Sequence, residues 1–190
     1  MLAATQSCLC LSCPFGVPLE FVKVLASFPP NTGPLRYILL ERAPRGSNTE
    51  LEKDPRNLIA AGSLGKGENT TGLNDHVQFS HTKMFIIDPM GPSPILVCGS
   101  GNFSETSCVK NDENYLVFKG QSSNVDVYFC DFMRVWRHWK SRYESNKQTK
   151  KTRGRNKSRM FLDPTPAWAT SWYDAANVKC VIREKMLALE

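Results

Sequence analysis

The stretch HTKMFIIDPMGPSPILVCGSGNFSETSCVKNDENYLVF, residues 81–118, decides the fold of this 190-residue chain. It holds three short runs of apolar, β-branched and aromatic residues, the first of which extends upstream to Val77, and such runs are typical of strands. Prolines and glycines separate the first two runs, so those strands should form a hairpin. The predicted strands are residues 77–88, 95–98 and 113–118. A tight turn at Gly99–Gly101 and a short helix or turn over 102–109 should connect the last two.

The sequence on either side predicts the remaining elements. Upstream, a strand over 5–12, a short amphipathic helix over 19–28 and a strand over 35–40 indicate a β-α-β unit with parallel strands. Residues 44–75 are polar and predict a long loop with at most one strand near 57–60. Downstream, aromatic residues at three- and four-residue steps between Val125 and Tyr143 predict an amphipathic helix packed on the sheet. The fold class we expect is α/β, a mixed β-sheet flanked by helices.

The candidate chemistry begins at His81 and Lys83. Side chains alternate between the two faces of a strand, so two residues that are two positions apart should point the same way. An imidazole can attack a phosphodiester as a nucleophile, and an ammonium can neutralise the charge that builds up on the phosphoryl oxygens. The pair therefore predicts phosphodiester chemistry.

Polar residues at the next turn fit the same reaction. Gly99 and Ser100 would let backbone and a hydroxyl approach a phosphate closely, and Asn102 would add an amide donor. Glu113, at the start of the following strand, could hold an imidazole in one tautomer.

This arrangement resembles the HKD motif of the phospholipase D superfamily. The resemblance rests on His81-x-Lys83-x4-Asp88, then Gly99-Ser100-x-Asn102 and Asn111-x-Glu113, and is strongest over residues 79–139. The chain looks most like the C-terminal half of a bacterial phospholipase D-like protein. The resemblance implies an α/β/α sandwich. We divide the chain into three parts: a phospholipase D-like domain over 1–145, a basic linker without apolar periodicity over 146–160, and a C-terminal extension over 161–190.

The resemblance also implies the roles of individual residues. Gly99, Ser100, Asn102 and Lys83 would bind the substrate phosphate, and no metal or cofactor is expected. Asp88 stands before Pro89, so a plain turn residue is the alternative for it. Ten residues separate Asp88 from Gly99, more than is usual in the family, and we place the extra ones in the 89–94 turn. The expected catalytic residues are His81, Lys83, Asp88, Asn102 and Glu113.

Only one such motif is present in the chain. The other histidines, His76 and His138, have no lysine two residues on. The family reaction, as the resemblance implies, uses two histidines: one attacks phosphorus, and the other protonates the leaving oxygen and then activates water or an alcohol. We therefore expect that a second half is required, either from a missing N-terminal half or from a second copy in a homodimer. An inactive single-motif partner subunit is the third alternative.

The charge distribution bears on the substrate. The net charge is +6, but residues 134–159 hold eleven Lys or Arg and one acidic residue, whereas thirteen basic and seventeen acidic residues lie outside that segment. The basic segment is most often a solvated linker, and it could also contact anionic lipid or nucleic acid. The sequence favours hydrolysis or phosphatidyl transfer on phospholipids, with a nuclease that acts on DNA as a homodimer as the alternative.

Cysteine usage and hydropathy bear on the compartment. Cys8, Cys10 and Cys13 cluster without a second cluster at zinc-like spacing, so free thiols in a reducing compartment are expected. No apolar run approaches the roughly 18 residues of a membrane span. The expected location is cytoplasmic, with peripheral contact at a membrane surface as an option.

Overall fold

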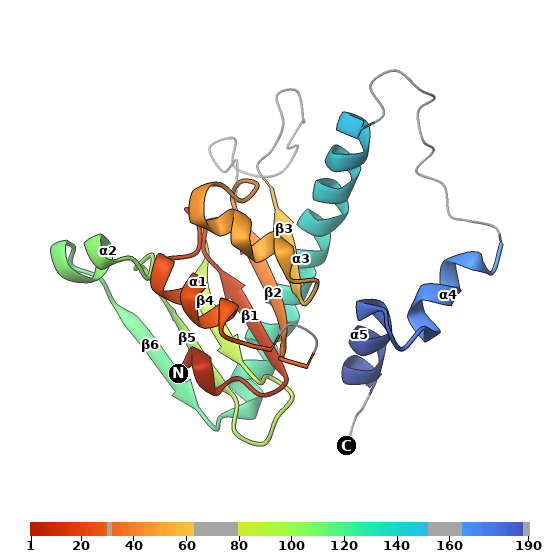
Figure 1. The fold of residues 1–190 in the computed structure, drawn as a ribbon. Coiled ribbons are helices and arrows are strands. Elements are labelled where there is room, and N and C mark those ends of the chain that lie inside the picture. The colour runs from red at the N-terminus through yellow and green to blue at the C-terminus, as the bar shows by residue number, and fades with distance from the viewer. Residues whose placement is uncertain (30–31, 63–79, 152–164, 188–190) are drawn as a thin grey trace, which may run out of the picture. The chain divides into compact units, whose positions relative to one another are not determined.

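The computed structural model of the chain describes residues 1–29, 32–62, 80–151 and 165–187. It divides into two compact units, Met1–Tyr143 and Glu144–Glu190, which are considered separately. The first unit contains a six-stranded mixed sheet with helices on both faces, which confirms the predicted fold class (Figure 1).

The strands of the sheet follow the order β3-β2-β1-β4-β5-β6. The first three strands along the chain are parallel, as the predicted β-α-β unit requires, and β4, β5 and β6 are antiparallel to their neighbours. The central strands β1 and β2 are buried along their whole length, which suits their apolar sequences. The strands are β1 (Cys8–Ser12), β2 (Leu35–Leu40), β3 (Asn57–Ala61), β4 (Lys83–Ile87), β5 (Ile95–Gly99) and β6 (Tyr115–Lys119).

Alternate residues of the strands pack under different helices. Leu9 and Leu11 of β1 belong to one apolar cluster with Val22 and Leu25 of the helix α1 (Leu19–Ala26), and the 3₁₀ helix η2 (Gly46–Lys53) joins this cluster through Leu51. The short 3₁₀ helix η1 (Leu2–Ala4) adds Leu2. These helices therefore cover one face of the sheet (Figure 1).

The long helix α3 (Ser122–Lys151) covers the other face. Trp136 donates from its indole N–H to the main-chain carbonyls of Ile38 and Leu58, at 3.2 and 3.0 Å, and its ring meets Tyr37 edge-on. The predicted amphipathic stripe is confirmed, because its buried members are Val125, Phe132, Trp136, Trp139 and Tyr143.

Several predicted boundaries are wrong. The strand expected from residue 77 begins at Lys83, and residues 77–79 lie outside the described part of the chain. The expected loop over 44–75 contains the 3₁₀ helix η2, which was not predicted, and the strand β3, which was predicted near 57–60; residues 63–75 lie outside the described part of the chain. The helix α2 (Glu105–Lys110) and strand β6 each begin later than expected.

The C-terminal part differs in one respect from the predicted linker. Helix α3 continues to Lys151, so residues 146–151 are helical where a linker without apolar periodicity was expected to begin. Within the second unit, α4 (Ala167–Tyr173) and α5 (Val178–Leu187) pack on each other. The three-part division of the chain stays a prediction. Within the described residues, no helix combines the length and the apolarity that a membrane span requires.

Candidate active site

His81 and Lys83 lie together at the start of β4. The Lys83 Nζ is 2.7 Å from His81 Nδ1 and 3.1 Å from Nε2, so the ammonium lies beside the edge of the ring that carries both nitrogens. His81 is outside the strand, so strand alternation does not place it. Instead, Ser12 of β1 donates to the carbonyl of Thr82 at 2.6 Å and fixes the backbone between the two residues. The predicted pair is therefore formed by a different local geometry.

The charges around His81 favour its neutral form. Partial removal from water lowers the pKa of His81 below its ordinary value of 6.5, and the Lys83 charge lowers it further, while Glu41 acts in the opposite direction. A neutral imidazole has a free nitrogen lone pair, which an attacking group needs. The environment of His81 thus suits a nucleophile better than a proton donor.

Lys83 is buried although it is charged. Only 7% of the residue is exposed, and burial lowers the pKa of its ammonium, while the negative charge of Glu113 raises it. A desolvated ammonium interacts more strongly with a phosphoryl oxygen than a hydrated one does. Lys83 is therefore placed to stabilise negative charge beside His81.

The sheet brings the Gly99–Ser100 turn next to Lys83. Lys83 pairs with Gly99 across β4 and β5, and Gly99 pairs with Tyr115 across β5 and β6. A Cβ at Gly99 would lie 2.0 Å from the carbonyl oxygen of Asn114, so only glycine fits there. The close approach lets Ser100 and Asn114 exchange hydrogen bonds: the Ser100 N–H donates to the Asn114 carbonyl, and the Asn114 N–H donates to Ser100 Oγ, each at 3.1 Å.

Glu113 holds this turn rather than an imidazole. Its carboxylate accepts hydrogen bonds from the hydroxyls of Ser100 and Ser107, the latter at 2.9 Å, and from the Asn111 amide at 3.4 Å. These bonds, first the one from Ser100, lower the pKa of Glu113, and the charge of Lys83 adds to the effect. The sequence predicted that Glu113 orients an imidazole, but its hydrogen-bond partners are Ser100, Ser107 and Asn111 instead. Glu113 acts on the site through Ser100 and through its charge on Lys83.

Asn102 lies between the turn and α2. Its backbone N–H donates to the Ser107 hydroxyl at 3.0 Å, which links it to Glu113. Its side-chain oxygen is buried and has no hydrogen-bond partner among the described residues. The predicted contact of Asn102 with phosphate stays a prediction.

Asp88 lies apart from the other predicted catalytic residues. It follows β4 at the end opposite to Lys83, and its carboxylate accepts from the backbone N–H groups of Gln6, Ser7 and Cys8 at 2.7–2.9 Å and from the Ser7 hydroxyl at 2.9 Å. Burial would raise the pKa of Asp88, but these hydrogen bonds together lower it. The prediction that groups Asp88 with the catalytic residues is thus corrected, because its carboxylate joins β4 to the segment before β1.

Two residues next to His81 were not predicted from the sequence. The ring of Phe15 meets the His81 ring edge-on at a centroid distance of 5.3 Å, and Glu41 is the acid whose charge acts on the imidazole. Both follow strands that end at the edge where β4 begins, since β1 and β4 are antiparallel. For Phe15, the feature of the sequence that could have indicated its position was the Pro14-Phe15-Gly16 turn directly after a buried strand.

Possible metal ligands do not gather at the site. In the described ranges, no group of three His, Cys, Asp or Glu side chains could hold a metal ion. The arrangement as it stands provides a neutral imidazole, a buried ammonium and a rigid Gly-Ser turn.

Comparison with known proteins gives structural matches only. No family model and no curated protein sequence matches the chain. Among solved structures, NucT from Helicobacter pylori matches with a TM-score of 0.52 and 16% identity, over 70% of this chain and 80% of that one. Nuc from Salmonella typhimurium, described as a phospholipase D family member, matches with a TM-score of 0.51 and 16% identity, over 72% of this chain and 82% of that one. The chain therefore has the α/β fold of a phospholipase D family member.

Proposed function

We propose that this chain supplies one half of a phosphodiesterase active site that cleaves nucleic acid through a covalent intermediate on His81. The observation that carries the proposal is the contact between the His81 imidazole and the buried Lys83 ammonium at 2.7 Å. The names Nuc and NucT of two structures with this fold favour nucleic acid over the phospholipid that the sequence favoured.

The first step is attack by the neutral His81 ring on phosphorus. A P–N bond forms as the bond from phosphorus to the leaving oxygen breaks, and the leaving oxygen takes a proton. Lys83 lies beside His81 and stabilises the negative charge on the non-bridging oxygens. In the second step water attacks the same phosphorus, and the P–N bond breaks to restore neutral His81.

A second imidazole has to donate the first proton and accept one from water. An in-line displacement expels the leaving group opposite the nucleophile, so His81 cannot reach both sides of the phosphate. His138, on α3, contacts the ring of Trp139, while α3 covers one face of the sheet; His76 lies outside the described residues. Only His81 in this chain belongs to an HKD motif, so the proposal takes the second imidazole from another HKD half, in a second copy of the chain or in a separate polypeptide segment.

The test is a substrate panel with matched variants. The protein, in the assembly in which it is active, is assayed on single-stranded DNA, RNA, a chromogenic phosphodiester and phospholipid vesicles. His81→Ala and Lys83→Met should each reduce turnover of nucleic acid by at least about 100-fold, the scale of losing a general catalyst or a preorganised charge. His138→Asn and Lys23→Met are matched controls, because both residues are exposed and belong to the helices α3 and α1 rather than to the start of β4, and both variants should keep wild-type rates.

The outcomes separate the alternatives. Cleavage of phospholipid but not of nucleic acid would overturn the proposed substrate and leave the His81 chemistry in place. A lack of any His81-dependent turnover, alone or with a second HKD half, would favour an inactive partner subunit.

A further inference from the structure

A cavity of about 440 Å³ opens at the carboxyl ends of β1 and β2. It lies beside the candidate nucleophile, because one of its lining residues, Phe15, contacts the His81 ring. Its volume is within the range of small-ligand sites. The side chains that matter for its chemistry are Phe15, Glu41, Arg42, Arg45 and Asn48.

Phe15 presents an exposed ring on a rigid turn. Its residue is 63% exposed, which is unfavourable for a benzyl group in water. The turn is nevertheless fixed: the Glu41 N–H donates to the Pro14 carbonyl at 3.1 Å, and the Gly16 N–H donates to the Cys13 carbonyl at 3.1 Å.

Asn48 makes two hydrogen bonds to the backbone of Val17, which follows the same turn. Its side-chain oxygen accepts from the Val17 N–H at 2.7 Å, and its amide donates to the Val17 carbonyl at 2.9 Å. Gly16 adopts a φ of 110° that a residue with a side chain rarely takes. The backbone that carries the exposed Phe15 ring is thus fixed, which reduces the cost of ordering a stacking surface.

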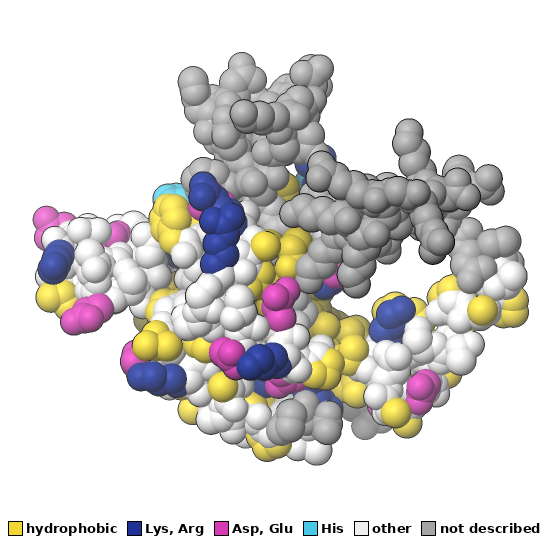
Figure 2. All heavy atoms as spheres, turned by 45° about the horizontal axis from the view of Figure 1, so that its top comes forward, with side chains coloured by type: hydrophobic (Ala, Val, Ile, Leu, Met, Phe, Trp, Pro, Cys, Tyr) yellow, Lys and Arg dark blue, Asp and Glu magenta, His cyan; other side chains and the backbone are white. Residues whose placement is uncertain are grey.

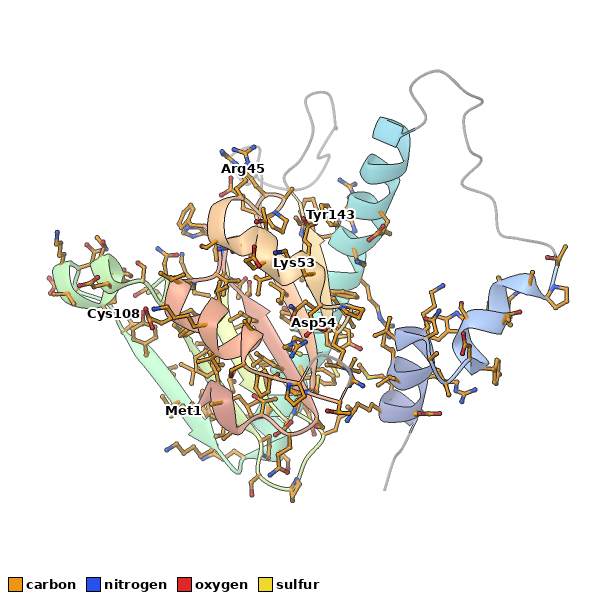
Figure 3. The ribbon with its side chains drawn as sticks, in the orientation of Figure 1. Met1, Arg45, Lys53, Asp54, Cys108 and Tyr143 are labelled. Atoms are coloured by element: carbon orange, nitrogen blue, oxygen red, sulfur yellow. The ribbon has the colours of Figure 1, made fainter. Side chains whose placement is uncertain are left out.

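The rim of the cavity is charged. Glu41 is buried and accepts from the Arg42 guanidinium at 3.0 Å. Arg45 is exposed and forms no ion pair with another residue that the structure describes. Figure 3 labels Arg45 where the chain enters η2, and Figure 2 shows histidine, hydrophobic and basic side chains next to one another on the same face. An acyl-chain pocket would be apolar, whereas this rim offers a ring and a cation.

We infer that Phe15 and Arg45 form a subsite for the nucleotide next to the scissile phosphate, with the base stacked on Phe15 and the adjoining phosphate on Arg45. This inference rests on the proposed function. A base has a flat π-face that stacks on an aromatic ring, and a guanidinium fits the planar, bidentate geometry of a phosphate. The Phe15 and His81 rings are 5.3 Å apart, so a base stacked on Phe15 would lie next to a phosphate at His81.

The test compares esters that share one leaving group. The substrates are thymidine 5′-(p-nitrophenyl phosphate), thymidine 3′-(p-nitrophenyl phosphate) and methyl p-nitrophenyl phosphate, so only the base-bearing ones can occupy the subsite. The wild-type protein should show a kcat/KM for the better thymidine ester between about 5-fold and 150-fold above that for the methyl ester, the range that base–aromatic stacking supplies. Because both kcat/KM values are measured on one preparation, their ratio does not depend on the fraction of the protein that is folded.

Variants assign the preference to Phe15. In Phe15→Ala the ratio should fall towards one, and in Phe15→Trp it should be kept. Met90→Ala is the matched control, because Met90 is also an exposed apolar residue but follows Asp88 at the opposite end of β4. A wild-type ratio near one, or a Phe15→Ala ratio equal to that of the wild type, would overturn the inference and leave His81-dependent cleavage standing.

Arg45 is tested with a 5′-phosphate on thymidine 3′-(p-nitrophenyl phosphate). The wild type should cleave the phosphorylated ester at least about 5-fold more efficiently, and Arg45→Ala should lose this gain, because a charge-assisted contact is removed. Lys53→Ala, at the exposed end of the same helix η2, should keep it.

Two further results would contradict the inference. A Phe15-dependent preference for p-nitrophenyl phosphorylcholine over the thymidine esters would assign the cavity to a cationic lipid headgroup. A lack of turnover of any ester, in every assembly, would overturn the proposed function and this subsite with it.

Discussion

His81 lies between two charges of opposite sign. Partial desolvation is the largest effect that disfavours the protonated imidazole, the charge of Lys83 adds to it, and the charge of Glu41 acts in the opposite direction. The sum keeps the ring neutral near pH 7, which is the state that a nucleophile requires. The pKa of this residue thus depends on one neighbour that the sequence motif contains, Lys83, and on one that it does not, Glu41.

Removing each charge should move the pKa of His81 in opposite directions. Lys83→Met removes a cation and should raise it, whereas Glu41→Gln removes an anion and should lower it. An NMR titration of the imidazole protons measures both without needing activity. Glu105→Gln, on the exposed helix α2, is the control and should leave the pKa where it is. Shifts of the same sign in both variants would contradict the assignment of these neighbours.

The pH dependence of cleavage should reflect the same ionisation. Because the imidazole must be neutral to attack, kcat/KM should fall as the pH falls through the pKa of His81, which lies below 6.5. A pH–rate profile measured on the chromogenic ester checks this. An acidic limb centred above 6.5 would show that the group that titrates is a different one.

The sequence predicted the pair at this site but not its surroundings. A local motif can specify the residues at the adjoining ends of the adjacent strands β4 and β5. These residues are His81, Lys83, Gly99 and Ser100. Phe15 and Glu41 come from other strands, and only the order of strands in the sheet brings them to His81. Spacing along the chain contains no information on such contacts.

At the scale of elements, β4 connects the site to the opposite edge of the sheet. Lys83 begins the strand, and Asp88 follows it at the other end with a φ of 46° and hydrogen bonds to the backbone before β1. The strand was predicted too early because the apolar residues Val77 and Phe79 extend the β-like pattern upstream of Lys83. Burial and pairing with β1 and β5, rather than propensity alone, define where the strand begins.

Asp88→Asn should therefore destabilise the fold rather than act on the chemistry. The amide replaces a charged acceptor and turns a donor towards backbone N–H groups, so the free energy of unfolding should fall by about 1–3 kcal/mol. The folded-state pKa of Asp88 is lowered, so this stabilisation is present above the ordinary carboxyl pKa of 3.8 and is lost as the pH falls through the folded-state value.

Urea unfolding of the wild type and the variant at pH 7 and at pH 3 measures both effects. The difference between them should be smaller at pH 3. Asp112→Asn, an exposed residue in the turn before β6, is the control and should change the unfolding free energy little at either pH. An Asp88→Asn protein of unchanged stability but greatly reduced kcat would return Asp88 to the catalytic group.

At the scale of the whole molecule, one unit presents one imidazole–ammonium pair at one edge of a six-stranded sheet. The mixed sheet could be predicted, because strand and helix patterns alternate along the chain. The extent of α3 could not, since helix formation over 147–151 does not require an apolar periodicity. The substrate could not either, because in the proposed reaction the motif would contact only the phosphodiester, which lipids and nucleic acids share.

The proposed mechanism predicts that catalysis survives the removal of metal ions by a chelator. The reaction as proposed takes its nucleophile and its positive charge from His81 and Lys83, so excess EDTA should leave the rate on the chromogenic ester within about 2-fold of the untreated protein. Complete loss of activity, restored by a divalent ion, would contradict the covalent-histidine mechanism.

The most direct test of the central claim is to trap the covalent intermediate. The active assembly is mixed with the thymidine ester that it cleaves better, quenched in alkali within one turnover, digested and mapped by mass spectrometry. A phosphoramidate of a histidine is stable in base and labile in acid, so the two treatments identify the bond. A thymidylyl adduct is expected on the peptide that contains His81, and none in His81→Ala. Steady turnover with no adduct, or with the adduct on another residue of this chain, would contradict it.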